Sequence, residues 1–175
     1  LFYIANLEIY GLQRASTARE AIKVMGELAE KYGYADGGET LVIGDAKELW
    51  VFEICGGGLL WTPESGTPEA HWVAQRVPDD EVFVGANRAR IGELRFDDAN
   101  FMISSRITEL AEKMGWWKKG LPFNYAKVFN PEPYGAPFYQ TRREWRALSL
   151  LAPSKQFPIH DEYAEYPFSI KPDKK

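Results

Sequence analysis

The sequence predicts an α+β fold in which amphipathic helices lie on antiparallel sheets. Four short apolar runs, rich in Val, Ile, Phe and Trp, form two pairs, and a polar turn joins the two runs of each pair. Stretches with a helical apolar stripe precede and follow these runs. Paired runs of this kind are typical of β-hairpins, whereas the stripes are typical of helices that cover a sheet.

Length and composition fit one soluble globular domain. The 175 residues can bury a sizeable core, and 45% hydrophobic with 26% charged residues excludes a disordered chain. A net charge of −4, from 21 Lys and Arg against 25 Asp and Glu, gives no support to a nucleic-acid partner. No apolar run approaches the roughly 20 residues that span a bilayer, so no membrane partner is expected.

Cysteine and histidine usage restricts the kinds of site. Cys55 is the single cysteine, so no internal disulfide can form. His71 and His160 are the two histidines, and they are too far apart in sequence to show a metal-ligand spacing. We therefore expect no metal at these residues, whereas a site made of carboxylates alone stays open.

The first predicted helix runs from about Ser16 to Tyr32. Thr17 and Glu20 form a T-x-x-E capping box, in which side-chain oxygens satisfy amide groups left open at a helix start. Gly33 is expected to end the helix. One face carries the apolar stripe, which consists of Ala18, Ala21, Ile22, Met25, Leu28, Ala29 and Tyr32.

Two consecutive hairpins are predicted between Thr40 and Gly92. The first pairs Leu41–Ile43 with Leu49–Ile54, and the second pairs His71–Val77 with Glu81–Ala86. Glu53 is the one charged residue in its run, so both faces of that strand are expected to be covered.

Two further helices are predicted towards the C-terminus. The first runs from about Ala99 to Met114, and the second from about Thr141 to Leu151, where Thr141 and Glu144 form another T-x-x-E box. The aromatic and proline-rich passage from Trp116 to Phe138 is expected to be irregular. Residues 152–175 contain four prolines and are interpreted as an extended tail.

Cys55 and the glycines after it are the first candidates for chemistry. A cysteine at a strand end can act as a nucleophile, but no base adjoins it, which favours a small buried thiol. Gly56, Gly57 and Gly58 could bind an anion through their amides, yet no phosphate-loop pattern follows, which favours a turn. His71 and the aromatic passage are likewise interpreted as structural.

Asn87 is a stronger candidate, because it ends an apolar strand and precedes Arg88 and Arg90. An Asn amide in this place can donate to a developing oxyanion, although Asn is also a common turn residue. Arg142 and Arg143 lie in the first turn of a predicted helix, where the helix dipole disfavours cations, so a carboxylate partner is expected. From the residues alone, both interpretations stay open.

Five runs, in order along nearly the whole chain, resemble one family of hydrolases. They are TAREAI, IGDAKELWVFE, HWVAQRVPDDEVFVGAN, RREWRALSLLAPS and YPFSIKPDKK. The chain resembles the dipeptidases of peptidase family C69, which are N-terminal nucleophile hydrolases. The resemblance implies an αββα four-layer sandwich, in which two antiparallel sheets pack face to face and helices lie outside.

The resemblance also implies a mechanism. An N-terminal Cys attacks the peptide carbonyl of a dipeptide or small amide, with its own α-amino group as the base, and no dissociable cofactor is needed. Cys55 does not match that nucleophile, which the family places upstream of the matching residues, and the family continues past Lys175. On this basis, residues 1–175 form one incomplete domain that needs the remainder of the polypeptide as a partner and is inactive alone.

Two site residues can be carried over from the related choloylglycine hydrolases. Asn87 resembles the strand-end Asn that orients the substrate or contributes to the oxyanion hole. Arg143 resembles the active-site Arg that lies near the thiol and favours its ionised form, and Arg142 is the alternative.

Other functions are compatible with the same resemblance. They are an amidase or acylase of the same superfamily, and a catalytically inactive binding or structural domain with this fold. A homo-oligomer is left open, and so is the compartment, with the cytoplasm favoured.

Overall fold

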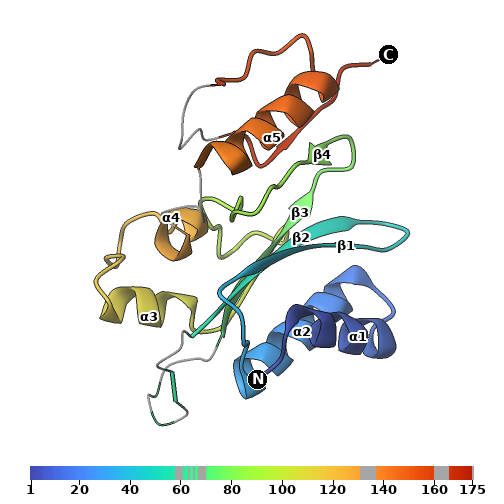
Figure 1. Ribbon diagram of the computed structural model, residues 1–175. Helices are drawn as coiled ribbons and strands as arrows, with labels where there is room; N and C mark the ends of the chain where they lie inside the picture. The colour runs from blue at the N-terminus through green and yellow to red at the C-terminus, as the bar shows by residue number, and fades with distance from the viewer. Residues whose placement is uncertain are drawn as a thin grey trace.

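A four-stranded antiparallel sheet divides the molecule, with helices on both sides (Figure 1). The computed structural model describes residues 1–57, 61–62, 64, 66, 70–130, 137–159 and 166–174. The strand order is β1-β2-β3-β5, and these strands are Glu39–Gly44, Leu49–Gly56, Ala70–Val77 and Phe101–Ile103. A second sheet pairs β4 (Val82–Phe83) with β6 (Ser169–Ile170), again antiparallel. The fold is α+β, as the sequence predicted.

Helices α1 (Ile4–Arg14) and α2 (Ala18–Tyr32) cover one face of the main sheet (Figure 1). α2 confirms the first predicted helix: the Glu20 amide donates to Thr17 Oγ1 at 3.2 Å, and Gly33 ends the helix with φ 90°. The sequence did not predict α1. Its buried residues are Leu7 and Gly11 alone, so the apolar stripe is too narrow to stand out in the sequence.

The backbone of α2 lies directly on a tryptophan of β3. A Cβ atom at Gly26 would be 2.3 Å from Cε2 of Trp72, so this position needs a glycine. The indole Nε1 of Trp72 also donates to Glu30 Oε1 at 2.7 Å. Helix and sheet are therefore held both by apolar contact and by one hydrogen bond.

The first predicted hairpin is confirmed as β1–β2, and its turn is tied to α2. Asp45 Oδ1 accepts from the amides of Lys47 at 2.7 Å and Glu48 at 3.0 Å. Asp45 Oδ2 accepts from the amide of Ala18, the first residue of α2, at 2.9 Å. These amide donors hold the pKa of Asp45 below its usual value.

The second predicted hairpin is wrong. β3 forms, but it pairs with β2 and β5, whereas β4 leaves the main sheet and pairs with β6. The edge of β3 that a hairpin partner would occupy is taken by Phe101–Ile103, which pairs with Val73, Ala74 and Gln75. The strands that pair with β3 and β4 instead, β5 and β6, lie far from them along the chain.

The helix predicted over 99–114 is correct only in its second half. Residues Phe101–Ile103 form β5, and α3 (Ile107–Lys113) begins after Arg106. Pairing with β3 outweighs the helical spacing of the first apolar residues in this stretch.

The last helix, α5 (Pro137–Leu151), begins before the predicted start. Thr141 and Glu144 are therefore inside the helix and do not form a capping box; both side chains are buried. The passage expected to be irregular contains one short helix, α4 (Tyr125–Phe129), and its residues 131–136 lie outside the described residues.

Three apolar clusters lie between four successive layers. The first lies between α1–α2 and the main sheet and includes Ile22 and Trp50. The second covers the other face of the main sheet around Val73, with Phe83 of β4 packed on it. In the third, Leu148 of α5 packs with β6. The order is helix, sheet, sheet, helix, with two strands in the second sheet among the described residues.

Among the helices that the structure describes, none has the length and apolar character of a membrane-spanning segment.

Candidate functional site

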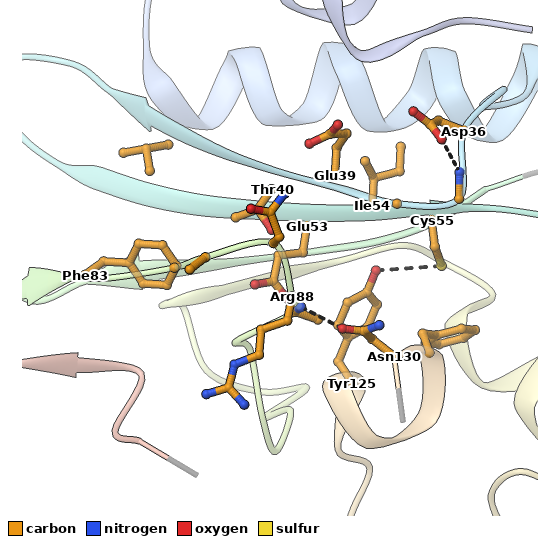
Figure 2. A pocket seen from close by; sticks show the side chains of 18 residues that line it. Asp36, Glu39, Thr40, Glu53, Ile54, Cys55, Phe83, Arg88, Tyr125 and Asn130 are labelled. Atoms are coloured by element: carbon orange, nitrogen blue, oxygen red, sulfur yellow. Dashed lines mark hydrogen bonds between the residues drawn. The ribbon is translucent and has the colours of Figure 1, made fainter. Parts of the chain in front are cut away.

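A pocket of about 710 Å³ opens between the β1–β2 side of the main sheet and the segment that follows β4 (Figure 2). The sheet contributes Glu53 and Cys55, and α4 contributes Tyr125 and Phe129. The segment after β4 contributes residues 85–89. Small-molecule sites usually have volumes of roughly 300–1,000 Å³, so this pocket has the size for a small ligand.

One wall of the pocket is the segment Val84–Ile91, here called the Asn87 loop. Glu53, on β2, is 1% exposed and holds the end of this loop. Its Oε1 accepts from the Arg90 amide at 2.7 Å, and its Oε2 accepts from the Ile91 amide at 3.2 Å. A carboxylate buried in an apolar sheet therefore fixes two consecutive main-chain groups.

A second buried carboxylate holds the same loop from α5. Glu144 is fully buried, and its Oε1 accepts from the Ala86 amide at 3.2 Å. It also forms ion pairs with Arg88 and Arg90, the latter at 3.2 Å between Oε1 and Nη1. Arg90 further donates to the carbonyl oxygen of Pro167 at 2.8 Å. Glu144 thus contacts the loop on both sides of Asn87, and Glu53 holds its end.

Asn87 itself stands in a left-handed backbone conformation, with φ 54°. Asn tolerates this region better than most residues with a side chain. Its Oδ1 accepts from Arg143 Nη2 at 2.8 Å. Arginine has only donors, so the amide oxygen must face Arg143, which turns Nδ2 away from it. Within the described part of the chain, Nδ2 of Asn87 has no acceptor.

The structure brings Arg143 to Asn87 and does not bring Arg142 there. Arg143 Nε also donates to the carbonyl oxygen of Tyr139 at 2.8 Å, and its guanidinium lies 3.8 Å from the Tyr139 ring centroid. The Arg142 guanidinium instead lies 4.8 Å from the ring centroid of Phe138. Among the described residues neither arginine has the expected carboxylate partner: Arg143 pairs with an amide, and Arg142 packs on an aromatic ring. The two arginines also lie well inside α5, away from its first turn.

Burial raises the pKa of Glu53 to about 7. Loss of solvation is the main cause, and the nearby charge of Glu144 adds to it. The amides of Arg90 and Ile91 and the charge of Arg90 oppose this rise. Glu53 therefore changes its protonation state close to neutral pH while it holds the Asn87 loop.

The sequence matches one protein family along almost its whole length. The model of peptidase family C69 matches residues 4–175. This chain belongs to peptidase family C69. It is 33% identical over 162 residues to the "Probable dipeptidase" of Latilactobacillus sakei, covering 91% of this chain and 31% of that protein.

Two other relatives match a similar share of the chain. The "Probable dipeptidase B" of Lactococcus lactis subsp. lactis (strain IL1403) is 28% identical over 151 residues, covering 83% of this chain and 29% of that protein. "Dipeptidase A" of Lactobacillus helveticus is 28% identical over 139 residues, covering 78% of this chain and 26% of that protein. The chain therefore spans less than a third of the length of each of these C69 relatives.

Cys55 has the environment of a structural thiol in this C69 chain. Tyr125 extends from α4 towards β2, and its hydroxyl donates to Cys55 Sγ at 3.8 Å (Figure 2). The thiol lies 3.6 Å from the carbonyl oxygen of His71, to which it donates. Loss of solvation raises the pKa of Cys55 to about 12, so the thiol stays protonated at neutral pH.

The other early candidates also lie in structural surroundings. His71 is fully buried and stacks on Phe129 at 5.0 Å between ring centroids; burial lowers its pKa to about 4. Gly56 allows a close backbone approach, because a Cβ there would be 2.6 Å from the carbonyl oxygen of Tyr34. Gly58 lies outside the described residues.

Sequence reasoning missed the two carboxylates that hold the Asn87 loop. Glu53 was visible as the one charge in an apolar strand, but its partners follow it by 37 and 38 residues. Glu144 was interpreted as half of a capping box. No group of three or more His, Cys, Asp or Glu that could hold a metal occurs among the described residues.

Proposed function

We propose that this chain supplies part of the active site of a thiol-dependent dipeptidase. Membership of peptidase family C69 and the names of the relatives support a dipeptidase. The observation that carries the proposal is the hydrogen bond between Arg143 and Asn87 beside a pocket of about 710 Å³. The remainder of the same polypeptide supplies the nucleophile.

In the proposed reaction, the nucleophile is an N-terminal Cys outside residues 1–175. Its α-amino group takes the thiol proton, and the thiolate attacks the peptide carbonyl carbon to form a tetrahedral oxyanion. The C–N bond then breaks, the amino group of the second residue leaves with a proton, and water hydrolyses the thioester. The two amino acids and the free thiol result.

Asn87 is proposed to donate to the oxyanion. Its Oδ1 is held by Arg143 at 2.8 Å, so Nδ2 carries the two hydrogens that can point at the developing charge. A donor fixed in advance needs no reorientation during the reaction, which is the source of its catalytic effect.

Arg143 is proposed to have a second effect. Its guanidinium is always charged, and a cation near the N-terminal Cys favours the thiolate over the thiol. Arg143 thus orients Asn87 and lowers the pKa of the nucleophile.

Alkylation of the intact protein tests the nucleophile. Iodoacetamide should abolish dipeptide hydrolysis, with the added mass on the peptide that begins with Cys. The matched control is Cys55→Ala, which should keep its kcat and remain sensitive to the reagent. Residues 1–175 alone should hydrolyse nothing.

Three results would contradict the proposal. Loss of activity on chelation with full resistance to alkylation would indicate a metallopeptidase. Hydrolysis of other linear amides but not of dipeptides would indicate an amidase or acylase. An intact protein that binds dipeptides without cleaving them would indicate an inactive binding domain.

A further inference from the structure

Glu53 occupies a place where an apolar residue would be expected. Its neighbours on β2 and β3 with side chains on the same face, Val51 and Val73, are fully buried in the core on the side of the main sheet opposite α1 and α2. Burying a carboxylate there costs free energy unless its oxygens are bonded. The bonds that offset this cost are the two amides of the Asn87 loop.

The place of these bonds in the loop gives Glu53 a role. The amides of Arg90 and Ile91 come three and four residues after Asn87, and the Glu144 bond to Ala86 comes just before it. Asn87, which lies between the bonded amides of Ala86 and Arg90, has φ 54°. The surrounding contacts must maintain this conformation. Figure 2 shows Glu53 between β2 and the segment that carries Arg88.

We propose that Glu53 is a positioning residue: by accepting from Arg90 and Ile91, its carboxylate sets the backbone of the Asn87 loop and so aims the Asn87 amide into the pocket. This proposal rests on the proposed function of Asn87. Glu53 acts through Asn87 and takes no part in proton transfer.

A carboxylate is required because two donors must be accepted at once. An ionised carboxylate offers two acceptor oxygens, whereas a glutamine or a protonated glutamic acid turns one of them into a donor. A donor facing an amide N–H removes one anchor and lets the loop shift. A displacement of about 1 Å at a catalytic group can lower the rate by about 10²-fold.

Charged and titratable groups from several elements surround Glu53 among the described residues. Arg90 and Glu144 face it as an ion pair, and Cys55 and Tyr125 have pKa values raised by burial, so both stay neutral. The pKa of Glu53 is about 7. Protonation of Glu53 below this pH therefore removes one of its two amide bonds to the loop, while the contacts of Glu144 with the loop remain.

A double-mutant cycle on the intact enzyme tests the proposal. Glu53→Gln should lower kcat by about 10-fold to 100-fold with a smaller change in KM. In the Asn87→Ala background, the same substitution should add no further loss, because the residue through which it acts is gone. The control Glu48→Gln removes a carboxylate that pairs with Arg19 away from the pocket, and should leave kcat unchanged.

A pH series gives the same answer without relying on the folding of the Glu53 variant. The ratio of kcat for the wild type to kcat for Asn87→Ala cancels the titration of the nucleophile. It should be constant above pH 8 and shrink as the pH falls through about 7. A ratio that is constant from pH 5.5 to 8.5, a Glu53→Gln variant with wild-type kcat, or additive losses in the cycle would overturn the proposal.

Failure of the proposed function has a different signature. An intact wild type without thiol-dependent hydrolysis would defeat that function and leave the anchoring to be judged by amide hydrogen exchange. The Arg90 and Ile91 amides should then exchange faster in Glu53→Gln than in the wild type, and equal exchange rates would overturn the anchoring.

Discussion

The two faces of the main sheet are built by different means. On the face towards α1 and α2, the core is apolar and contains residues such as Ile22, Trp50 and Phe52. On the face towards the pocket, the carboxylates of Glu53 and Glu144 are buried among apolar side chains and hold a loop without regular structure. Apolar side chains pack on both faces, but the pocket face in addition holds a loop through buried carboxylates. We therefore call it the tethered face, and the face towards α1 and α2 the packed face.

We expect the packed face to contribute mainly to the stability of the fold, and the tethered face to fix the position of the Asn87 loop. Apolar packing is tolerant of small shifts and supplies most of the favourable free energy of folding. Buried ionic contacts add little net stability, but each fixes a direction and is costly to break. The predictions below ask whether the two faces behave in these different ways.

The largest effect should come from Glu144, because its removal leaves Arg88 and Arg90 buried without their common anion. Glu144→Ala should lower the free energy of unfolding by about 3–5 kcal/mol, measured by urea unfolding of the intact protein. The control is Arg146→Ala, an exposed change on the same helix, which should alter it by less than about 0.5 kcal/mol. A loss under about 1 kcal/mol for Glu144→Ala would show that the loop is not tethered in this way.

Asn87 comes next, with an effect on rate rather than stability. The proposed role of Asn87 as an oxyanion donor predicts that Asn87→Ala lowers kcat of the intact protein by about 10²–10³-fold. Asn87→Gly is the matched control, because glycine adopts φ 54° without strain. Equal losses in both variants would assign the effect to the amide, whereas an active glycine variant would assign it to the backbone.

The two neighbouring arginines should differ more modestly. Arg143→Met removes a charge-assisted hydrogen bond to Asn87 and should lower kcat by about 10-fold to 100-fold, with the pH profile of the thiol moved upward. Arg142→Met, which loses only its contact with Phe138, should be close to wild type. The reverse ranking in steady-state kinetics would make Arg142 the site arginine.

The smallest effect belongs to the packed face. Thr17→Ala removes the oxygen that accepts the Glu20 amide at the start of α2, and should lower the free energy of unfolding by about 1 kcal/mol. Because this face does not shape the pocket, kcat should not change. A rate loss in this variant would show that the two faces are coupled.

Helix α2 and the β1–β2 hairpin of the packed face could be predicted because their signals are local, whereas α1 could not. The Thr17 cap and Gly33 stop mark α2 within the helix itself, and the β1–β2 turn lies between the strands it joins. The pairing of β3 and β4 could not be predicted, because it is decided by β5 and β6. Two strand-like runs joined by a turn pattern are close in sequence, but this does not show that they pair with each other.

The site divides in the same way. Asn87 and the Arg142–Arg143 pair could be singled out as candidates from their places in the sequence, and only the resemblance to a family favoured Arg143 over Arg142. Glu53 was correctly expected in a strand with both faces covered, but its role depends on amides that only the fold brings near. Glu144 misled the prediction, because a T-x-x-E pattern is equally compatible with a position inside a helix.

The outer edge of β1 has a consequence for handling the protein. β1 ends the main sheet, and the described residues place no strand beyond it. Free amides and carbonyls along such an edge template the addition of strands from other molecules. Residues 1–175 produced alone are therefore expected to aggregate as their concentration rises, before they lose helix or sheet. Light scattering should detect this aggregation.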